Sequence, residues 1–83
     1  MQNQSRTLIS SSEQWLVHWL TQRNPDACIH LEENFYEAGL VDSFGVIELL
    51  NEVEEHFGLE FDEHDFTSPE LMTIRGLAAI LDR

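Results

Sequence analysis

Ser43 is the residue whose type and setting point most directly to chemistry. It lies in the run Gly39-Leu40-Val41-Asp42-Ser43-Phe44, which leads directly into an amphipathic run from Gly45 to Leu50. Its hydroxyl could cap a helix, act as a nucleophile or accept a covalent group. Capping is the most frequent role of a serine at the start of a helix.

Hydrolytic catalysis by Ser43 would require a general base within hydrogen-bond reach and donors that stabilise an oxyanion. No Gly-x-Ser-x-Gly element is present, and no recognisable triad motif includes any of the histidines, which are His18, His30, His56 and His64. We therefore do not expect an enzyme. A hydroxyl at a helix start is accessible to a modifying enzyme. Because Ser43 has no evident base, its setting favours a role as the attachment point of a covalent group.

The remaining polar residues do not predict a dedicated metal site. Asp62-Glu63-His64-Asp65 lacks the glycine and the ligand spacing of an EF-hand loop. The single cysteine, Cys28, excludes an internal disulfide and a multi-cysteine zinc site.

Acidic residues dominate the charge of the chain. Sixteen Asp and Glu residues against four arginines give a net charge of −12, and no Lys or Arg occurs between Asn24 and Ile74. Such a surface repels phosphate backbones, which excludes nucleic-acid binding. It is instead expected to steer the protein towards basic patches on partner proteins.

The length of 83 residues predicts a single domain over 10–83 after a flexible N-terminal lead over 1–9. No apolar run approaches the roughly 20 residues of a membrane span, and the N-terminus has no apolar stretch typical of a signal peptide. We therefore expect a monomeric, cytoplasmic protein without membrane insertion.

Helical periodicity predicts an all-α fold, a small four-helix bundle with three longer helices and one short helix. The first helix is expected over about 11–23, with a capping box formed by Ser10 and Glu13 and a stop at Asn24-Pro25. Its apolar stripe consists of Trp15, Leu16, Trp19 and Leu20. A long loop over 24–42 follows, packed through scattered apolar anchors that are Ile29, Leu31, Phe35, Tyr36 and Leu40.

The helix over about 43–57 is the clearest prediction. Asp42 or Ser43 can cap its start, and Gly58 can end it. The buried stripe is expected to contain Val46, Leu49, Leu50, Val53 and Phe57. A short third helix is expected around 65–71 from Ser68-Pro69-Glu70, and Thr73 can cap a last helix with the stripe Ile74, Leu77, Ala78 and Leu81.

The block from Gly39 to Phe44, with Glu48-Leu49 after it, resembles the acyl carrier protein family. The resemblance extends over about residues 10–83, including Phe57-Gly58, the Ser68-Pro69 segment and Thr73-Ile74. It implies that a phosphopantetheinyl transferase attaches phosphopantetheine, taken from coenzyme A, to Ser43. The terminal thiol would then carry acyl or aminoacyl groups as thioesters for activating and transferring enzymes.

A partner-docking face is expected at the start and on the outer side of the second helix, suited to basic patches on those enzymes. Its residues are Asp42, Phe44, Ile47, Glu48, Glu52 and Glu55. Glu48 and Glu52 repel each other at a spacing of four, so helix stability does not explain this face. Phe44 could instead fold back onto the bundle, and Glu54 could be merely solvated.

Gly45 departs from the pattern of fatty-acid carriers, which usually have an acidic residue here. Asp42-Ser43-Phe44-Gly45 is also similar to D-alanyl carrier proteins and to stand-alone carriers of specialised pathways, although Phe66–Leu71 lacks the tryptophan and asparagine of the D-alanyl branch. We therefore expect a discrete carrier of a specialised pathway. The alternative from another class of function is an acidic docking module, a helical protein that binds partners without being modified.

Overall fold

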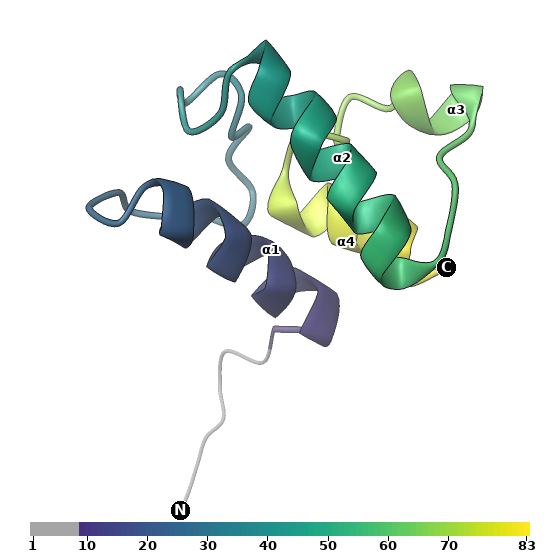
Figure 1. Cartoon of the computed structure of the whole chain (residues 1–83), viewed down its shortest axis with the longest axis horizontal. Coiled ribbons are helices and arrows are strands. Elements are labelled where there is room, and N and C mark those ends of the chain that lie inside the picture. Colours follow the sequence, from purple (N-terminus) through teal and green to yellow (C-terminus); the bar gives the residue numbers. More distant parts are fainter. Residues whose placement is uncertain (1–8) are drawn as a thin grey trace, which may run out of the picture.

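Four helices follow one another in the part of the chain that the computed structural model describes, residues 9–83 (Figure 1). They are α1 (Ser11–Arg23), α2 (Ser43–Phe57), α3 (Glu63–Phe66) and α4 (Ile74–Leu81). The all-α prediction is confirmed, since extended pairing within these residues is limited to one isolated bridge between Asn34 and Thr73. None of these helices has the length and apolar character needed to span a membrane. The predicted N-terminal lead, apart from Ile9, lies outside the described residues.

Helix α1 begins and ends where local signals predict. The Ser10 hydroxyl accepts a hydrogen bond from the Glu13 N–H, and the Glu13 carboxylate accepts one from the Ser10 N–H, which completes the capping box. Leu16, Trp19 and Leu20 are buried on one face. Trp15 is half-buried and stacks on His56 of α2.

Helix α2 is capped by Asp42, which resolves the choice between Asp42 and Ser43. The Gly45 N–H donates to Asp42 Oδ1 at 2.8 Å. At the other end Gly58 adopts the left-handed conformation, with φ of 68°. Leu49 and Val53 form the fully buried part of the predicted stripe.

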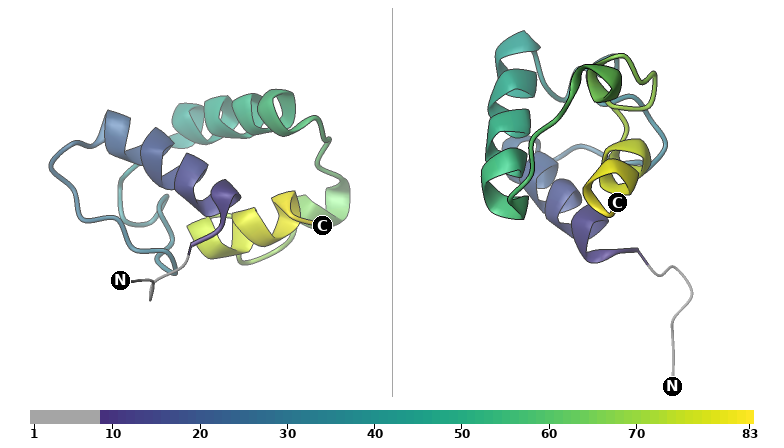
Figure 2. Two further views of the ribbon diagram at one scale, coloured as in Figure 1. Left: turned by 90° about the horizontal axis from the view of Figure 1, so that it is seen from below. Right: turned by 90° about the vertical axis from the view of Figure 1, so that its right-hand side faces the viewer.

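The core lies between α1, α2 and α4, which surround it in all three views, with α3 set to one side (Figures 1 and 2). Helices α1 and α4 pack directly against each other. The side chains that are less than 2% exposed are Leu16, Leu20, Phe35, Leu49, Val53, Ile74 and Leu77. Phe35 and the buried Val41 come from the long loop, which therefore contributes to the core as predicted.

Backbone hydrogen bonds hold the loop over 24–42 in place. The Phe35 N–H donates to the Met72 carbonyl, and the Arg75 N–H donates to the Leu31 carbonyl, each at 2.9 Å. Gly39 provides the predicted left-handed turn, with φ of 81°. The anchor prediction was wrong for Tyr36, which is 46% exposed.

The position predicted for the third helix was wrong. Helix α3 ends at Phe66, because Asp62 and Asp65 form a capping box that starts the helix earlier. The Ser68 hydroxyl, expected to cap the helix, accepts from the Glu70 N–H in a turn instead. The alternative that Glu54 is merely solvated does not hold, since its carboxylate accepts from the Phe61 N–H at 2.8 Å.

An ion pair between the buried carboxylate of Asp65 and the exposed Arg83 joins α3 to the segment after α4. Asp65 is only 2% exposed, and Arg83 lies 3.0 Å from its carboxylate. The hydrogen bond from the Asp62 N–H and the contact with Arg83 hold the pKa of Asp65 below its ordinary value of 3.8. The ionised carboxylate is therefore the form that stabilises the fold.

Asp65→Asn should destabilise the protein at neutral pH and matter less in acid. The substitution retains an acceptor for the Asp62 N–H but removes the charge that pairs with Arg83. Because the folded pKa is depressed, the stabilisation is present above the unfolded pKa of 3.8 and is lost as pH falls through the folded value. Urea unfolding of both proteins from about pH 7 to about pH 3 measures this. A difference in unfolding free energy that stays constant would contradict it.

Candidate functional site

Ser43 is the first residue of α2, and its side chain is exposed to solvent. Because Asp42 supplies the cap, the Ser43 hydroxyl is not needed to start the helix. The first backbone N–H groups of a helix have no acceptor within it and, with the helix dipole, favour a nearby anion. Asp42 opposes this with its own charge, although one of its oxygens is engaged by Gly45.

The side chain that contacts the Ser43 hydroxyl is Tyr36. The phenol oxygen lies 3.3 Å from Ser43 Oγ, and it is the side-chain hydrogen-bond partner of this hydroxyl within residues 9–83. A tyrosine in this position is not the histidine or carboxylate base that a serine nucleophile requires. The geometry is that of an accessible hydroxyl held by a neutral neighbour.

A mainly apolar cavity of about 310 Å³ opens beside Ser43. Its other lining residues are Tyr36, Val46, Ile47 and Met72. They come from the long loop, from the first turns of α2 and from the segment that precedes α4. A group attached to Ser43 would start at the edge of this hollow.

The residues predicted to form the docking face lie at the cap of α2 and along the helix, and they differ in exposure. Phe44 is 83% exposed and Ile47 is 58% exposed, so Phe44 does not fold back onto the bundle. Asp42, Glu48 and Glu55 are also exposed, whereas Glu52 is half-buried. Apolar and acidic groups therefore share the surface next to Ser43.

Arg23, at the end of α1, is the member of this region that sequence reasoning missed. Its guanidinium lies 3.0 Å from Glu48 Oε1 and 3.8 Å from Glu52 Oε2. It also stacks on the Trp19 ring, whose Nε1–H donates to Glu52 at 3.0 Å. Arg23 thus offsets the repulsion expected between the two glutamates and ties Glu52 to the fold.

The structure shows a close contact at Gly45 that the sequence did not suggest. A Cβ atom at this position would lie 3.1 Å from Val41 Cβ, on the segment that enters the helix. A larger residue at this position would therefore require Val41 to shift by a few tenths of an ångström.

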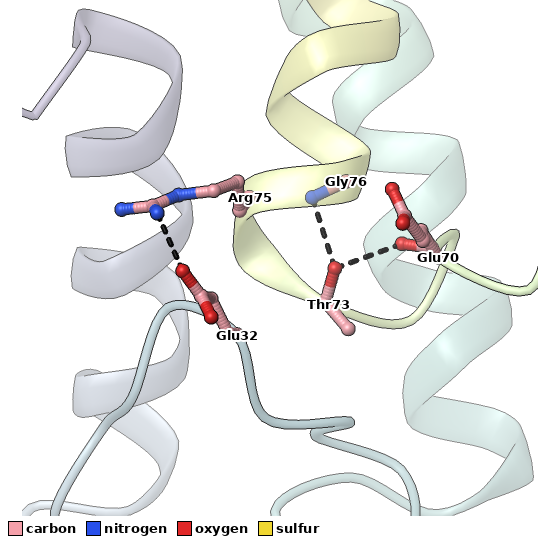
Figure 3. Close-up of a pocket in the computed structure, with 5 residues that line it drawn as sticks. All are labelled: Glu32, Glu70, Thr73, Arg75 and Gly76. Atoms are coloured by element: carbon pink, nitrogen blue, oxygen red, sulfur yellow. Dashed lines mark hydrogen bonds and ion pairs between the residues drawn. The ribbon is translucent and has the colours of Figure 1, made fainter.

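A second hollow lies at the start of α4 (Figure 3). Thr73 Oγ1 accepts from the Gly76 N–H at 2.9 Å and donates to the Glu70 carbonyl at 3.0 Å. Across the hollow, Arg75 binds Glu32 at 2.6 Å. The hydrogen bonds of Thr73 and the ion pair of Arg75 with Glu32 therefore join the loop to α4 at this hollow.

The chain was compared with protein families, curated proteins and solved structures. A family model described as "Phosphopantetheine attachment site" matches residues 19–81, which include Ser43, all of α2 and the cavity beside it. No curated protein and no solved structure matches the chain.

Proposed function

The chain belongs to the phosphopantetheine attachment site family, and from this premise we propose that Ser43 is the residue that holds the group. The resemblance to acyl carrier proteins is thereby confirmed, and the protein is a non-catalytic carrier with covalently bound phosphopantetheine. One observation carries the choice of residue. Ser43 places an exposed hydroxyl, free of the capping role, at the first position of α2.

The residues around Ser43 fit a phosphodiester. The unpaired amides of the first helical turn and the helix dipole favour its negative charge, and the Tyr36 phenol is within reach of the ester oxygen. When bound, phosphopantetheine supplies a terminal thiol that holds acyl groups as thioesters. The chain's own contribution is to hold this arm at an exposed helix end beside an apolar hollow.

Within the carrier class, we propose a discrete, cytoplasmic carrier of acyl or aminoacyl groups in a specialised pathway. The support is the sequence around Ser43, where Gly45 replaces the acidic residue usual in fatty-acid carriers. Assaying the loaded protein with acyl- and aminoacyl-activating enzymes distinguishes the two kinds of cargo.

Intact-mass measurement after incubation with coenzyme A and a broad-range phosphopantetheinyl transferase tests the carrier function. We expect the whole population to gain the mass of one phosphopantetheine group. An unmodified docking module would gain none, and a transferase that loads a control carrier in parallel makes that result decisive.

Carrier domains interact with phosphopantetheinyl transferases and with acyl-handling enzymes. For this chain we propose that these partners dock on Asp42, Phe44, Ile47, Glu48, Glu52 and Glu55 through basic patches. The exposure of Phe44 and Ile47 supports an apolar centre beside Ser43. Because Arg23 already binds Glu48 and Glu52, a partner's basic group must share or displace it, whereas no such contact engages Glu55 within residues 9–83.

Reversing the charge of Glu48 and Glu55 together should lower kcat/KM for loading by about tenfold or less, mainly through slower association. Both side chains are exposed, so helical content should be unchanged. Glu52 is left intact because it accepts the Trp19 hydrogen bond. Loading rates at two salt concentrations and circular dichroism measure the effect, which high salt should reduce.

A matched control changes the net charge equally on the loop instead of on α2. Asp26→Lys with Glu33→Lys serves this purpose, since both residues are exposed. The proposal requires the α2 variant to load more slowly than this control. Equal rates would mean that overall charge, and not this face, governs docking.

A further inference from the structure

The hydrogen bond between the side chains of Tyr36 and Ser43 is poorly explained by a contribution to folding stability. The phenol oxygen is 3.3 Å from Ser43 Oγ, and either oxygen can donate. Tyr36 is 46% exposed and Ser43 is exposed, so water competes for both groups. An exposed neutral hydrogen bond of this kind adds little to the free energy of folding. A role at the Ser43 hydroxyl explains the contact better.

The turn that carries Tyr36 is fixed to the core. Phe35, its neighbour, is 1% exposed and donates its N–H to the Met72 carbonyl. The Tyr36 carbonyl accepts from the Gly39 N–H at 3.1 Å, and the Glu37 N–H donates to Asn34 Oδ1 at 2.8 Å. Because hydrogen bonds hold the turn on both sides, the fold presents the ring to the start of α2.

The Tyr36 ring also forms part of the wall of the apolar cavity, together with Val46, Ile47 and Met72. Ser43 lies at the edge of the same cavity. The ring therefore limits the space available to the Ser43 side chain, and the hydrogen bond favours one of its three staggered rotamers.

We propose that Tyr36 is a positioning residue for the loading of Ser43, an inference that rests on the proposed function. In loading, a bond forms between Ser43 Oγ and a phosphorus atom of coenzyme A, and the phosphorus–oxygen bond of its diphosphate breaks. Adenosine bisphosphate leaves, and the serine proton passes to a base of the transferase. A phenol that donates to Oγ holds this oxygen in one orientation and leaves the serine proton free for that base.

The same phenol keeps a role after loading. Ser43 Oγ then has no proton, so Tyr36 can only donate to it or to a neighbouring oxygen of the phosphodiester. Tyr36 thus restrains the first bonds of the arm at the edge of the cavity that its own ring lines.

Tyr36→Phe removes the hydroxyl and retains the ring, so it separates positioning from packing. With coenzyme A and a broad-range transferase, we expect kcat for loading to fall about fivefold while KM stays close to the wild-type value. The ³¹P resonance of the loaded variant should differ from that of the loaded wild type. Its urea unfolding curve should overlay that of the wild type, because the lost bond is exposed.

The outcomes separate this inference from the function on which it rests. Wild-type protein that gains no mass refutes attachment itself. Loading of both proteins with equal kcat and identical ³¹P resonances overturns the role of Tyr36 and leaves attachment intact. A lower kcat caused only by a shifted unfolding curve, with an unchanged resonance, also overturns it, since Tyr36 would then be merely structural.

Discussion

Ser43→Ala should abolish the transfer of phosphopantetheine from coenzyme A to this protein. The proposed acceptor is the Ser43 hydroxyl, and alanine offers no atom that can form the ester. The fold should persist, because Asp42 supplies the helix cap and the hydrogen bond to Tyr36 is exposed. Intact-mass measurement should show complete loading of the wild type and none of the variant, with matching circular dichroism.

Ser11→Ala is the matched control for this substitution. Ser11 is likewise an exposed serine at the first position of its helix, α1. The control should load completely, at the wild-type rate. Loading that survives Ser43→Ala would move the attachment site to another hydroxyl and would contradict the assignment.

Gly76→Ala should destabilise the protein by about 2 kcal/mol or more, the usual range for an overpacked core. A Cβ atom at Gly76 would overlap the Glu70 carbonyl oxygen and come within 2.8 Å of Thr73 Oγ1 (Figure 3). The backbone of the turn before α4 would therefore have to move. Alanine's higher helix propensity offsets only about 1 kcal/mol of this cost. Urea unfolding followed by circular dichroism measures the change.

Ala79→Gly provides the comparison within the same helix. Ala79 is exposed in α4, so its replacement costs only the difference in helix propensity, about 1 kcal/mol. We expect the Gly76 variant to be the less stable of the two. A Gly76 variant as stable as the wild type would show that α4 does not pack this closely on the preceding turn.

The ends of three helices could be predicted because their signals are local. Ser10 and Glu13 lie three residues apart and cap α1 through each other, and Gly58 ends α2 through its own backbone conformation. Thr73 caps α4 in the same local way. The proposal of Ser43 as the attachment residue also rests on a local signal, since the residues around it form a contiguous pattern.

Helix α3 could not be placed from the sequence, because two capping patterns lie close together there. The capping box of Asp62 and Asp65 competes with the helix start expected at Ser68. Asp65 also pairs with Arg83, which stabilises the earlier start through a contact 18 positions away. Local helix propensities carry no information about a contact between residues so far apart in the sequence.

The surroundings of Ser43 were also hidden from the sequence. Arg23 reaches Glu48 across 25 positions, and no spacing rule for a single helix predicts that pairing. Tyr36 was predicted to be an apolar anchor because aromatic residues are usually core residues. The left-handed turn at Gly39 and the buried Phe35 direct it to Ser43 instead.

The most direct test of the account is to locate the attached group within the chain. Cleavage of the loaded protein after Glu37 and Glu48 releases residues 38–48, in which Ser43 is the only serine, threonine or tyrosine. Tandem mass spectrometry should find the added mass on this peptide and assign it to Ser43. The same mass on any other peptide, or an unmodified chain after treatment with an active transferase, would contradict the account.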